Sequence, residues 1–238
     1  MEKLYDQLLE DVRFREGLAA CINCGTCTAI CPAAEFYIYD PRKITNLVQS
    51  KNETEIEALL KSETIWYCGE CMSCKTRCPR GNTPGLIIMA LRALSQKLGY
   101  FTHSEKGRQQ LVLKRVIGES IYNTGYCLLM KGASLDFHPE QGPIWGWEQQ
   151  NWDDVFDRLG ANFQKEGPGI LRKIPKEAMD EIHEIFKVTG GDALFESIEK
   201  HSAIKAQEMG QTLSDDTWCD YTLNAYTANN DMHTRTDD

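Results

Sequence analysis

One cysteine pattern occurs twice in this sequence, and it constrains the fold more than any other feature. Residues 21–32 read CINCGTCTAICP and residues 68–79 read CGECMSCKTRCP, so both follow the spacing C-x₂-C-x₂-C-x₃-C-P. The chain has ten cysteines and starts with MEKLYDQLLEDVRFREGL, which lacks the layout of a secretory signal. Because the cytosol keeps thiols reduced, so many cysteines indicate metal binding rather than a disulfide framework.

The metal is the next question, and the spacing distinguishes two answers. Two C-x₂-C pairs could form one structural Cys₄ zinc site. Zinc, however, does not need the third cysteine of each motif or the fourth cysteine followed by proline. That complete run is typical of ferredoxins with [4Fe–4S] clusters, in which the fourth cysteine binds the other cluster. The sequence therefore predicts two [4Fe–4S] clusters, the first held by Cys21, Cys24, Cys27 and Cys78 and the second by Cys68, Cys71, Cys74 and Cys31.

Residues around the cysteines suggest how the two clusters differ. Gly25 and Gly69 follow cysteines directly, where they either let backbone amides approach sulfur or serve as ordinary turn glycines. The second motif carries Lys75 and Arg77, whereas no charged residue separates the cysteines of the first. Since positive charge favours the reduced cluster, we expect the second cluster to have the higher potential unless these side chains lie in solvent.

The rest of the chain has helical patterns without the two-residue period of strands, so the predicted fold class is all-α. Asp40-Pro41 reads as a cap and a first helical residue, and Ile56, Leu59 and Leu60 recur at helical spacing. Further helices are predicted from Pro84 to Gly99, from a capping box at residues 102–105 to about residue 122, from Pro175 to Gly190, and from Asp192 to about residue 201.

These patterns divide the chain into four parts. We expect an α-helical two-cluster ferredoxin domain over residues 1–125, an irregular Trp-rich linker or docking segment over 126–174, C-terminal helices over 175–201 and a polar tail over 202–238. Trp145, Trp147 and Trp152 either cover the core or anchor a partner. Outside the motifs, Cys127 reads as a small buried hydrophobe and Cys219 as an incidental thiol.

Charge and missing motifs limit the function. The net charge of −9 argues against nucleic acid as a partner, and no apolar run is long enough to span a membrane, so we expect a cytoplasmic protein. The five histidines are scattered, and neither a dinucleotide-binding motif nor a P-loop is present, so no catalytic residue is predicted. The composition fits a non-catalytic electron carrier that works with protein partners.

With its paired motifs, helical insert and the stretch IIMALR after the second Cys-Pro, the chain resembles the C subunit of heterodisulfide reductase over residues 1 to about 125. The resemblance implies an α-helical ferredoxin domain that passes electrons between a flavoprotein subunit and a catalytic subunit with CCG motifs, and it carries all eight motif cysteines over as cluster ligands. Iron–sulfur subunits of fumarate reductase and glycolate oxidase share related modules.

The stretch PKEAMDEIHEIFKVTGGDALFESIEK is similar to extensions in heterodisulfide reductase-like complexes of sulfur-oxidising bacteria. This second similarity implies a role in sulfur oxidation. It leaves open whether partners bring the chain to a membrane surface.

Overall fold

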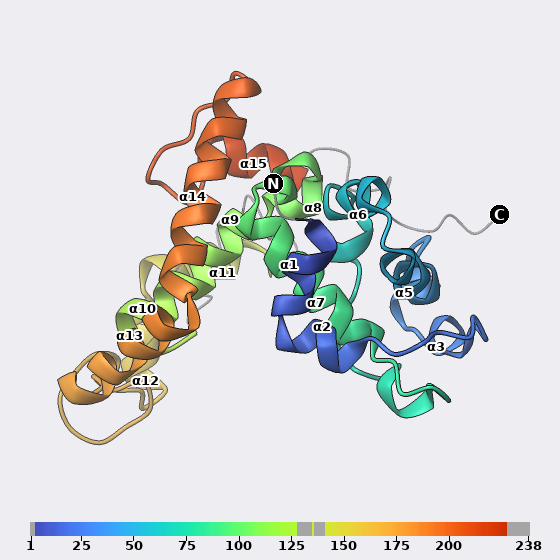
Figure 1. Ribbon diagram of the computed structural model, residues 1–238. Coiled ribbons are helices and arrows are strands. Elements are labelled where there is room, and N and C mark those ends of the chain that lie inside the picture. The colour runs from blue at the N-terminus through green and yellow to red at the C-terminus, as the bar shows by residue number, and fades with distance from the viewer. Residues whose placement is uncertain (1–2, 128–134, 136–140, 228–238) are drawn as a thin grey trace. The chain divides into compact units, whose positions relative to one another are not determined.

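The computed structural model describes residues 3–127, 135 and 141–227, and they divide into two compact units, residues 3–108 and residues 109–227. Throughout those ranges the ordered elements are helices, and the only β-type pairing is one isolated bridge between Ala161 and Ile170 (Figure 1). The predicted all-α fold is thus confirmed. In the described residues, no helix is both long and apolar enough to cross a membrane.

The first unit contains eight α-helices and three short 3₁₀ turns in the described chain. They are α1 (Leu4–Glu10), α2 (Val12–Gly17), α3 (Thr26–Ala29), α4 (Ala33–Phe36), α5 (Pro41–Ser50), α6 (Glu53–Leu60), η1 (Thr64–Trp66), η2 (Lys75–Arg77), α7 (Pro84–Lys97), η3 (Tyr100–His103) and α8 (Glu105–Arg108).

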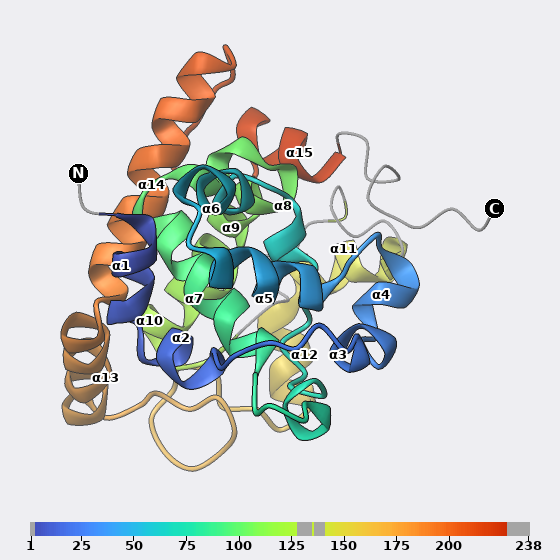
Figure 2. The same ribbon diagram turned by 45° about the vertical axis from the view of Figure 1, so that its right-hand side comes forward.

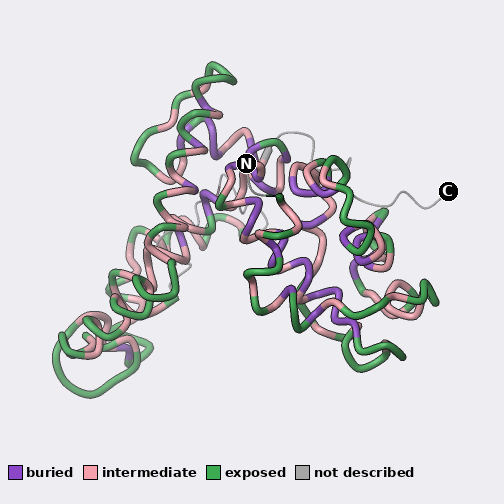
Figure 3. The backbone as a smooth tube through the Cα atoms, viewed as in Figure 1, coloured by how far each residue is buried: buried purple, intermediate pink, exposed green. Residues whose placement is uncertain are grey.

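Helix α7 is the centre of this unit, and α1, α2, α5 and α6 contact it (Figure 2). Its apolar residues recur at three- and four-residue intervals, so Ile87, Leu91 and Leu94 face the core, where Phe14 of α2 is also fully buried. A Cβ added at Gly17 would lie 3.1 Å from the backbone nitrogen of Ile87, so the missing side chain lets α2 approach α7 closely. The motif loops, in contrast, are exposed or half-buried (Figure 3).

Two predicted helix starts are confirmed and one is wrong. The carboxylate of Asp40 accepts from the backbone N–H of Arg42 and Lys43, so Asp40 caps α5 as expected. The start of a helix at Pro84 is confirmed as well. The predicted capping box at residues 102–105 does not form. Ser104 accepts from the N–H of Gly107 instead, and the carboxylate of Glu63 accepts from the N–H groups that follow Ser104, so a residue distant in sequence caps α8 in part.

The second unit is also helical. Its elements are α9 (Gln110–Leu113), the π-helical turn η4 (Lys114–Gly118), α10 (Glu119–Thr124), α11 (Pro143–Gln150), α12 (Trp152–Arg158), α13 (Lys176–Thr189), α14 (Gly191–Glu208) and α15 (Asp220–Thr227).

Several predicted limits in this unit need correction. Helix α11 lies in the segment predicted to be irregular, and α14 continues to Glu208 rather than ending near residue 201. Helix α15 lies in the segment predicted to be a polar tail, whose residues 228–238 fall outside the described chain. The start of α13 after Pro175 and its end before Gly190, which adopts φ 81°, are confirmed. The predicted domain limit at residue 125 also lies inside this unit, and the four-part division stays a prediction.

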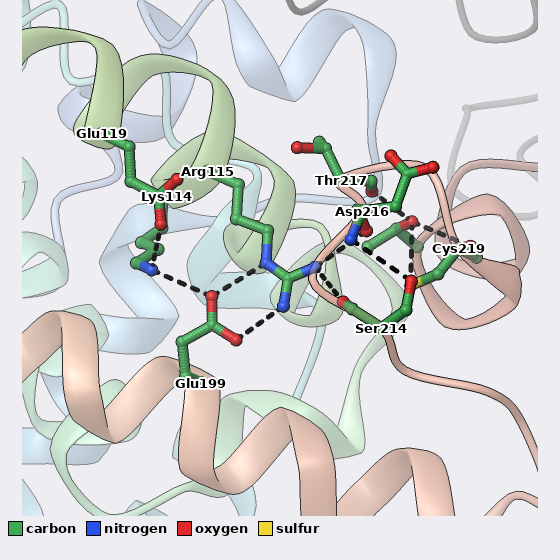
Figure 4. A network of polar contacts seen from close by, with 9 residues as sticks. Lys114, Arg115, Glu119, Glu199, Ser214, Asp216, Thr217 and Cys219 are labelled. Carbon is green, nitrogen blue, oxygen red and sulfur yellow. Dashed lines mark hydrogen bonds and ion pairs between the residues drawn. The ribbon is translucent and has the colours of Figure 1, made fainter. Parts of the chain in front are cut away.

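A polar network ties three segments of the second unit together (Figure 4). Glu199 on α14 accepts two hydrogen bonds of 2.8 Å from Arg115 and one of 2.9 Å from Lys114. Arg115 also donates to the backbone carbonyls of Ser214 and Asp216, ahead of α15. The side chains of Lys114 and Arg115 are only 10% and 7% exposed, so Glu199 supplies the counter-charge for two nearly buried cations.

Candidate iron–sulfur sites

The motif cysteines line two separate cavities, each with cysteines from both motifs. One cavity, which we call ring I, is lined by three cysteines of the first motif and the last of the second: Cys21, Cys24, Cys27 and Cys78. The other, ring II, is lined by three cysteines of the second motif and the last of the first: Cys68, Cys71, Cys74 and Cys31. The two groups coincide with the ligand sets predicted from the spacing.

The two motifs repeat the same backbone conformation. Asn23 and Glu70 occupy equivalent positions and both have positive φ, 60° and 53°. In each motif this residue donates its backbone N–H to the first cysteine sulfur, over 3.4 Å from Asn23 to Cys21 and over 3.4 Å from Glu70 to Cys68. A positive φ is costly for a residue such as glutamate, and strain of this kind concentrates at functional sites. Both loops are thus bent so that amides point at sulfur.

A second positive φ follows two residues later. Gly25 has φ 80°, and Met72 has φ 58° at the equivalent position. Glycine adopts this conformation without strain, so Gly25 is a turn glycine that also begins α3. Gly69 has no positive φ and a Cβ there would meet nothing within 4 Å, so a need for a bare backbone is not its role.

Two hydrogen bonds bring the start of the first motif to the end of the second. Thr83 donates its backbone N–H to the carbonyl of Gly17 over 2.7 Å, and Ala19 donates its N–H to Oδ1 of Asn82 over 2.8 Å. Turn η2 also contacts α3. This arrangement, which we call the clip, explains how Cys78 reaches the cavity of the first motif.

Helix α7 orders the second motif. Arg92 donates to the backbone carbonyls of Ile65 and Cys68 and forms an ion pair with Glu70. Pro84, the first residue of α7, lines both cavities. A helix N-terminus favours negative charge, so it suits a cluster whose four thiolates give it a net negative charge.

Positive charge gathers at ring I rather than ring II, which corrects the expectation from the sequence. Lys75 and Arg77 are exposed, and neither lines a ring, because η2 turns them outward. Arg42 and Arg80 line ring I instead. Arg42 comes from α5, outside both motifs, so motif composition alone does not show its position.

The thiols divide by burial in the same way in both motifs. Hydrogen bonding to Thr26 lowers the pKa of Cys24, and hydrogen bonding to Ser73 lowers the pKa of Cys71. Burial raises the pKa of the third cysteine of each motif, Cys27 or Cys74. The exposed thiols are thus closer to the thiolate form that binds iron, and the inner thiols gain most from a bound metal.

The donor set fits iron–sulfur clusters. Each cavity offers four thiols, amide groups directed at sulfur and a helix N-terminus, which is the environment that Fe–S clusters use. In the described part of the chain, no three Cys, His, Asp or Glu side chains meet closely enough for a single metal ion. A cubane does not require this, because each thiolate binds a different iron atom.

Two other cysteines are placed differently from the prediction. Cys127, predicted to be buried, is exposed, whereas Cys219, predicted to be incidental, is buried at the start of α15. Among the tryptophans, Trp152 packs edge-to-face on Phe163 with ring centroids 4.5 Å apart, and Trp147 is 52% exposed. The alternatives of core and partner contact therefore apply to different tryptophans.

The fold and the cysteine cavities define a class of helical iron–sulfur protein with paired cysteine motifs. The sequence profile of the 4Fe-4S dicluster domain family matches residues 17–82, which contain both motifs.

Named relatives narrow the class. The chain is 40% identical over 153 residues to the C subunit of the ferredoxin:CoB-CoM heterodisulfide reductase of Methanosarcina acetivorans, an alignment that covers 61% of this chain and 55% of the relative. It is 31% identical over 139 residues to the C2 subunit of the H(2)/formate:CoB-CoM heterodisulfide,ferredoxin reductase of Methanococcus maripaludis, covering 58% of this chain and 71% of the relative. The corresponding protein of Methanothermobacter marburgensis is 25% identical over 75% of this chain and 78% of its own length. The chain belongs to the family of heterodisulfide reductase C subunits.

Proposed function

We propose that this protein is the electron-transfer subunit of a heterodisulfide reductase-like complex. In this proposal it holds two [4Fe–4S] clusters, has no substrate site of its own, and relays single electrons between a flavoprotein subunit and a catalytic subunit with CCG motifs. The observation that carries the proposal is the pair of cavities, each lined by four cysteines drawn from both motifs. Fe–S clusters held by four thiolates carry electrons one at a time.

The crossed ligand sets are part of this proposal. Ring I and ring II each take three thiolates from one motif and the fourth from the other, which the bacterial spacing rule requires. The short clip at Gly17 and Thr83 supports the crossing, because it holds the two chain segments side by side without any metal.

The partners and the substrate follow by extension from the relatives. Their names specify CoB-CoM heterodisulfide, so we propose that the catalytic partner of this chain reduces or forms a disulfide of small thiols. Sulfur oxidation, suggested by the C-terminal stretch, is not part of the names of these relatives and stays a prediction.

We further propose that α11 contacts a partner protein. Ile144 and Trp147 lie three residues apart on this helix and are both exposed, so they present one apolar face. Exposed tryptophan is typical of interface hot spots. The feature remains within the docking segment predicted for residues 126–174.

The test of the proposal is anaerobic reconstitution of the full chain, followed by metal analysis and paramagnetic resonance. We expect about eight irons per chain and two reducible signals. Colourless protein with zinc would overturn the proposal in favour of a structural zinc module.

Single substitutions then test the crossing. Cys31→Ser should alter the cluster bound by the second motif, and Cys78→Ser the cluster bound by the first. Cys127→Ser is the matched control, because this exposed cysteine lies outside both motifs. Damage confined to the cluster of each substituted motif would contradict the crossed assignment.

A further inference from the structure

Resting on the proposed function, we infer that each cluster receives one hydrogen bond from a buried side chain outside the motifs: the amide of Asn82 at ring I and the hydroxyl of Tyr39 at ring II. Neither residue is a cysteine ligand, and neither lies within the spacing that predicts the clusters. Their role would be to set the two reduction potentials.

At ring I, the side chain of Asn82 is oriented by a bond that it already makes. It is 2% exposed, and its Oδ1 accepts the backbone N–H of Ala19 over 2.8 Å. This bond identifies the oxygen, so Nδ2 is the other atom of the amide. Nδ2 is buried and has no hydrogen-bond partner in the described chain, while Asn82 lines the cavity of ring I. The amide therefore has two donors to direct toward that cavity.

At ring II, Tyr39 has the equivalent property. It is 5% exposed and lines the cavity beside Cys31 and Cys68, and its hydroxyl is buried without a hydrogen-bond partner in the described residues. Its ring packs edge-to-face on Tyr67, with centroids 6.3 Å apart, which limits reorientation. Burial, and then the charge of the Cys68 thiolate, raise the pKa of Tyr39, so its hydroxyl keeps its proton next to sulfur.

A missing partner needs an explanation, because a buried donor without one costs about 1–3 kcal/mol. Both donors lie against the cavities that the thiolates line, so the acceptor that the site itself offers is cluster sulfur. Hydrogen bonds to sulfur stabilise the more negative, reduced cluster and raise its potential. The same physical device thus occurs at both rings, with donors of different chemistry.

The experiment is redox titration of the reconstituted full chain, followed by paramagnetic resonance, on Tyr39→Phe and Asn82→Asp. Tyr39→Phe removes only the hydroxyl. Asn82→Asp keeps the oxygen that accepts from Ala19, removes both donors and adds negative charge. We expect Tyr39→Phe to make reduction of one cluster about tenfold less favourable, a shift of ~59 mV for a one-electron couple. Asn82→Asp should lower the potential of the other cluster by at least as much.

Two controls separate a local effect from a general one. Tyr37→Phe makes the same change at a tyrosine that lines no ring, and Asn52→Asp makes the same charge change at the cap of α6. Both should leave the two potentials unchanged.

Iron content separates failure of this inference from failure of the proposed function. If wild type lacks two clusters, the proposed function fails. If both clusters load and Tyr39→Phe shifts neither potential, the hydroxyl bonds to something other than the cluster and the inference is wrong. Should Asn82→Asp fail to load, Tyr39→Phe alone decides the inference.

Discussion

Replacing Glu199 by glutamine should destabilise the second unit without affecting the cysteine rings. The carboxylate makes three charged hydrogen bonds to Lys114 and Arg115. Breaking a buried ion pair from one side typically costs ~3–5 kcal/mol, because the remaining charge stays unpaired. Lys114 keeps its bond to Glu119 and Arg115 keeps two carbonyls, and Glu199 itself is 31% exposed. We therefore expect a loss of ~2–3 kcal/mol in the free energy of unfolding.

The assay is denaturant unfolding at pH 7, followed by circular dichroism, with iron content measured in parallel. Glu184→Gln is the matched control, because its ion pair with Lys187 joins two largely exposed side chains and should contribute at most ~0.5 kcal/mol. Iron content should be unchanged, since both rings lie in the first unit. Equal stability of the two variants, or loss of iron from Glu199→Gln, would refute the reasoning.

The pH dependence gives the same prediction a second test. Hydrogen bonds from Arg115 and Lys114 outweigh burial and lower the pKa of Glu199 below its usual 4.5. A lowered pKa in the folded state means that the stabilisation is complete above that usual value and is lost as pH falls through the lower, folded value. The stability difference between wild type and Glu199→Gln should therefore be constant near neutral pH and shrink below about pH 4.5. A difference that grows on acidification would contradict this assignment.

Two further predictions concern charge and docking. Arg80→Gln should lower the potential of the ring I cluster more than Arg77→Gln lowers either potential in redox titrations, because only Arg80 lines a ring; equal shifts would contradict it. Trp147→Ser should weaken co-purification with partner proteins by at least tenfold while leaving iron content intact, whereas Val12→Ser, at another exposed apolar residue, should not; unchanged co-purification would exclude α11 from the interface.

Much of the fold follows from local sequence. The cap at Asp40 and the stop at Gly190 are short-range signals, so the limits of α5 and α13 were predictable. The start of α8 was not, because the groups that cap it include Glu63 from a distant turn. Helix α11 was missed because its Gly-rich, aromatic sequence has no helical period, although Pro143 occupies the favourable first position.

The candidate site divides in the same way. The cysteine groups were predictable because spacing along one motif encodes which thiols meet, and the cavities have those same members. Asn82 and Tyr39 were not identified, since nothing in the spacing shows which neighbouring polar groups become buried. Likewise, Arg42 reaches ring I through the packing of α5, so counting charges within the motifs pointed to the wrong ring.

The clip between Gly17 and Thr83 has a consequence for maturation. Its hydrogen bonds are backbone or amide contacts, and the core around α7 is apolar, so neither needs iron to form. Small zinc domains, in contrast, fold only when metal binds. The newly made chain can therefore fold first and bring both motifs together, so the machinery that supplies iron and sulfide meets two partly organised rings rather than a disordered segment.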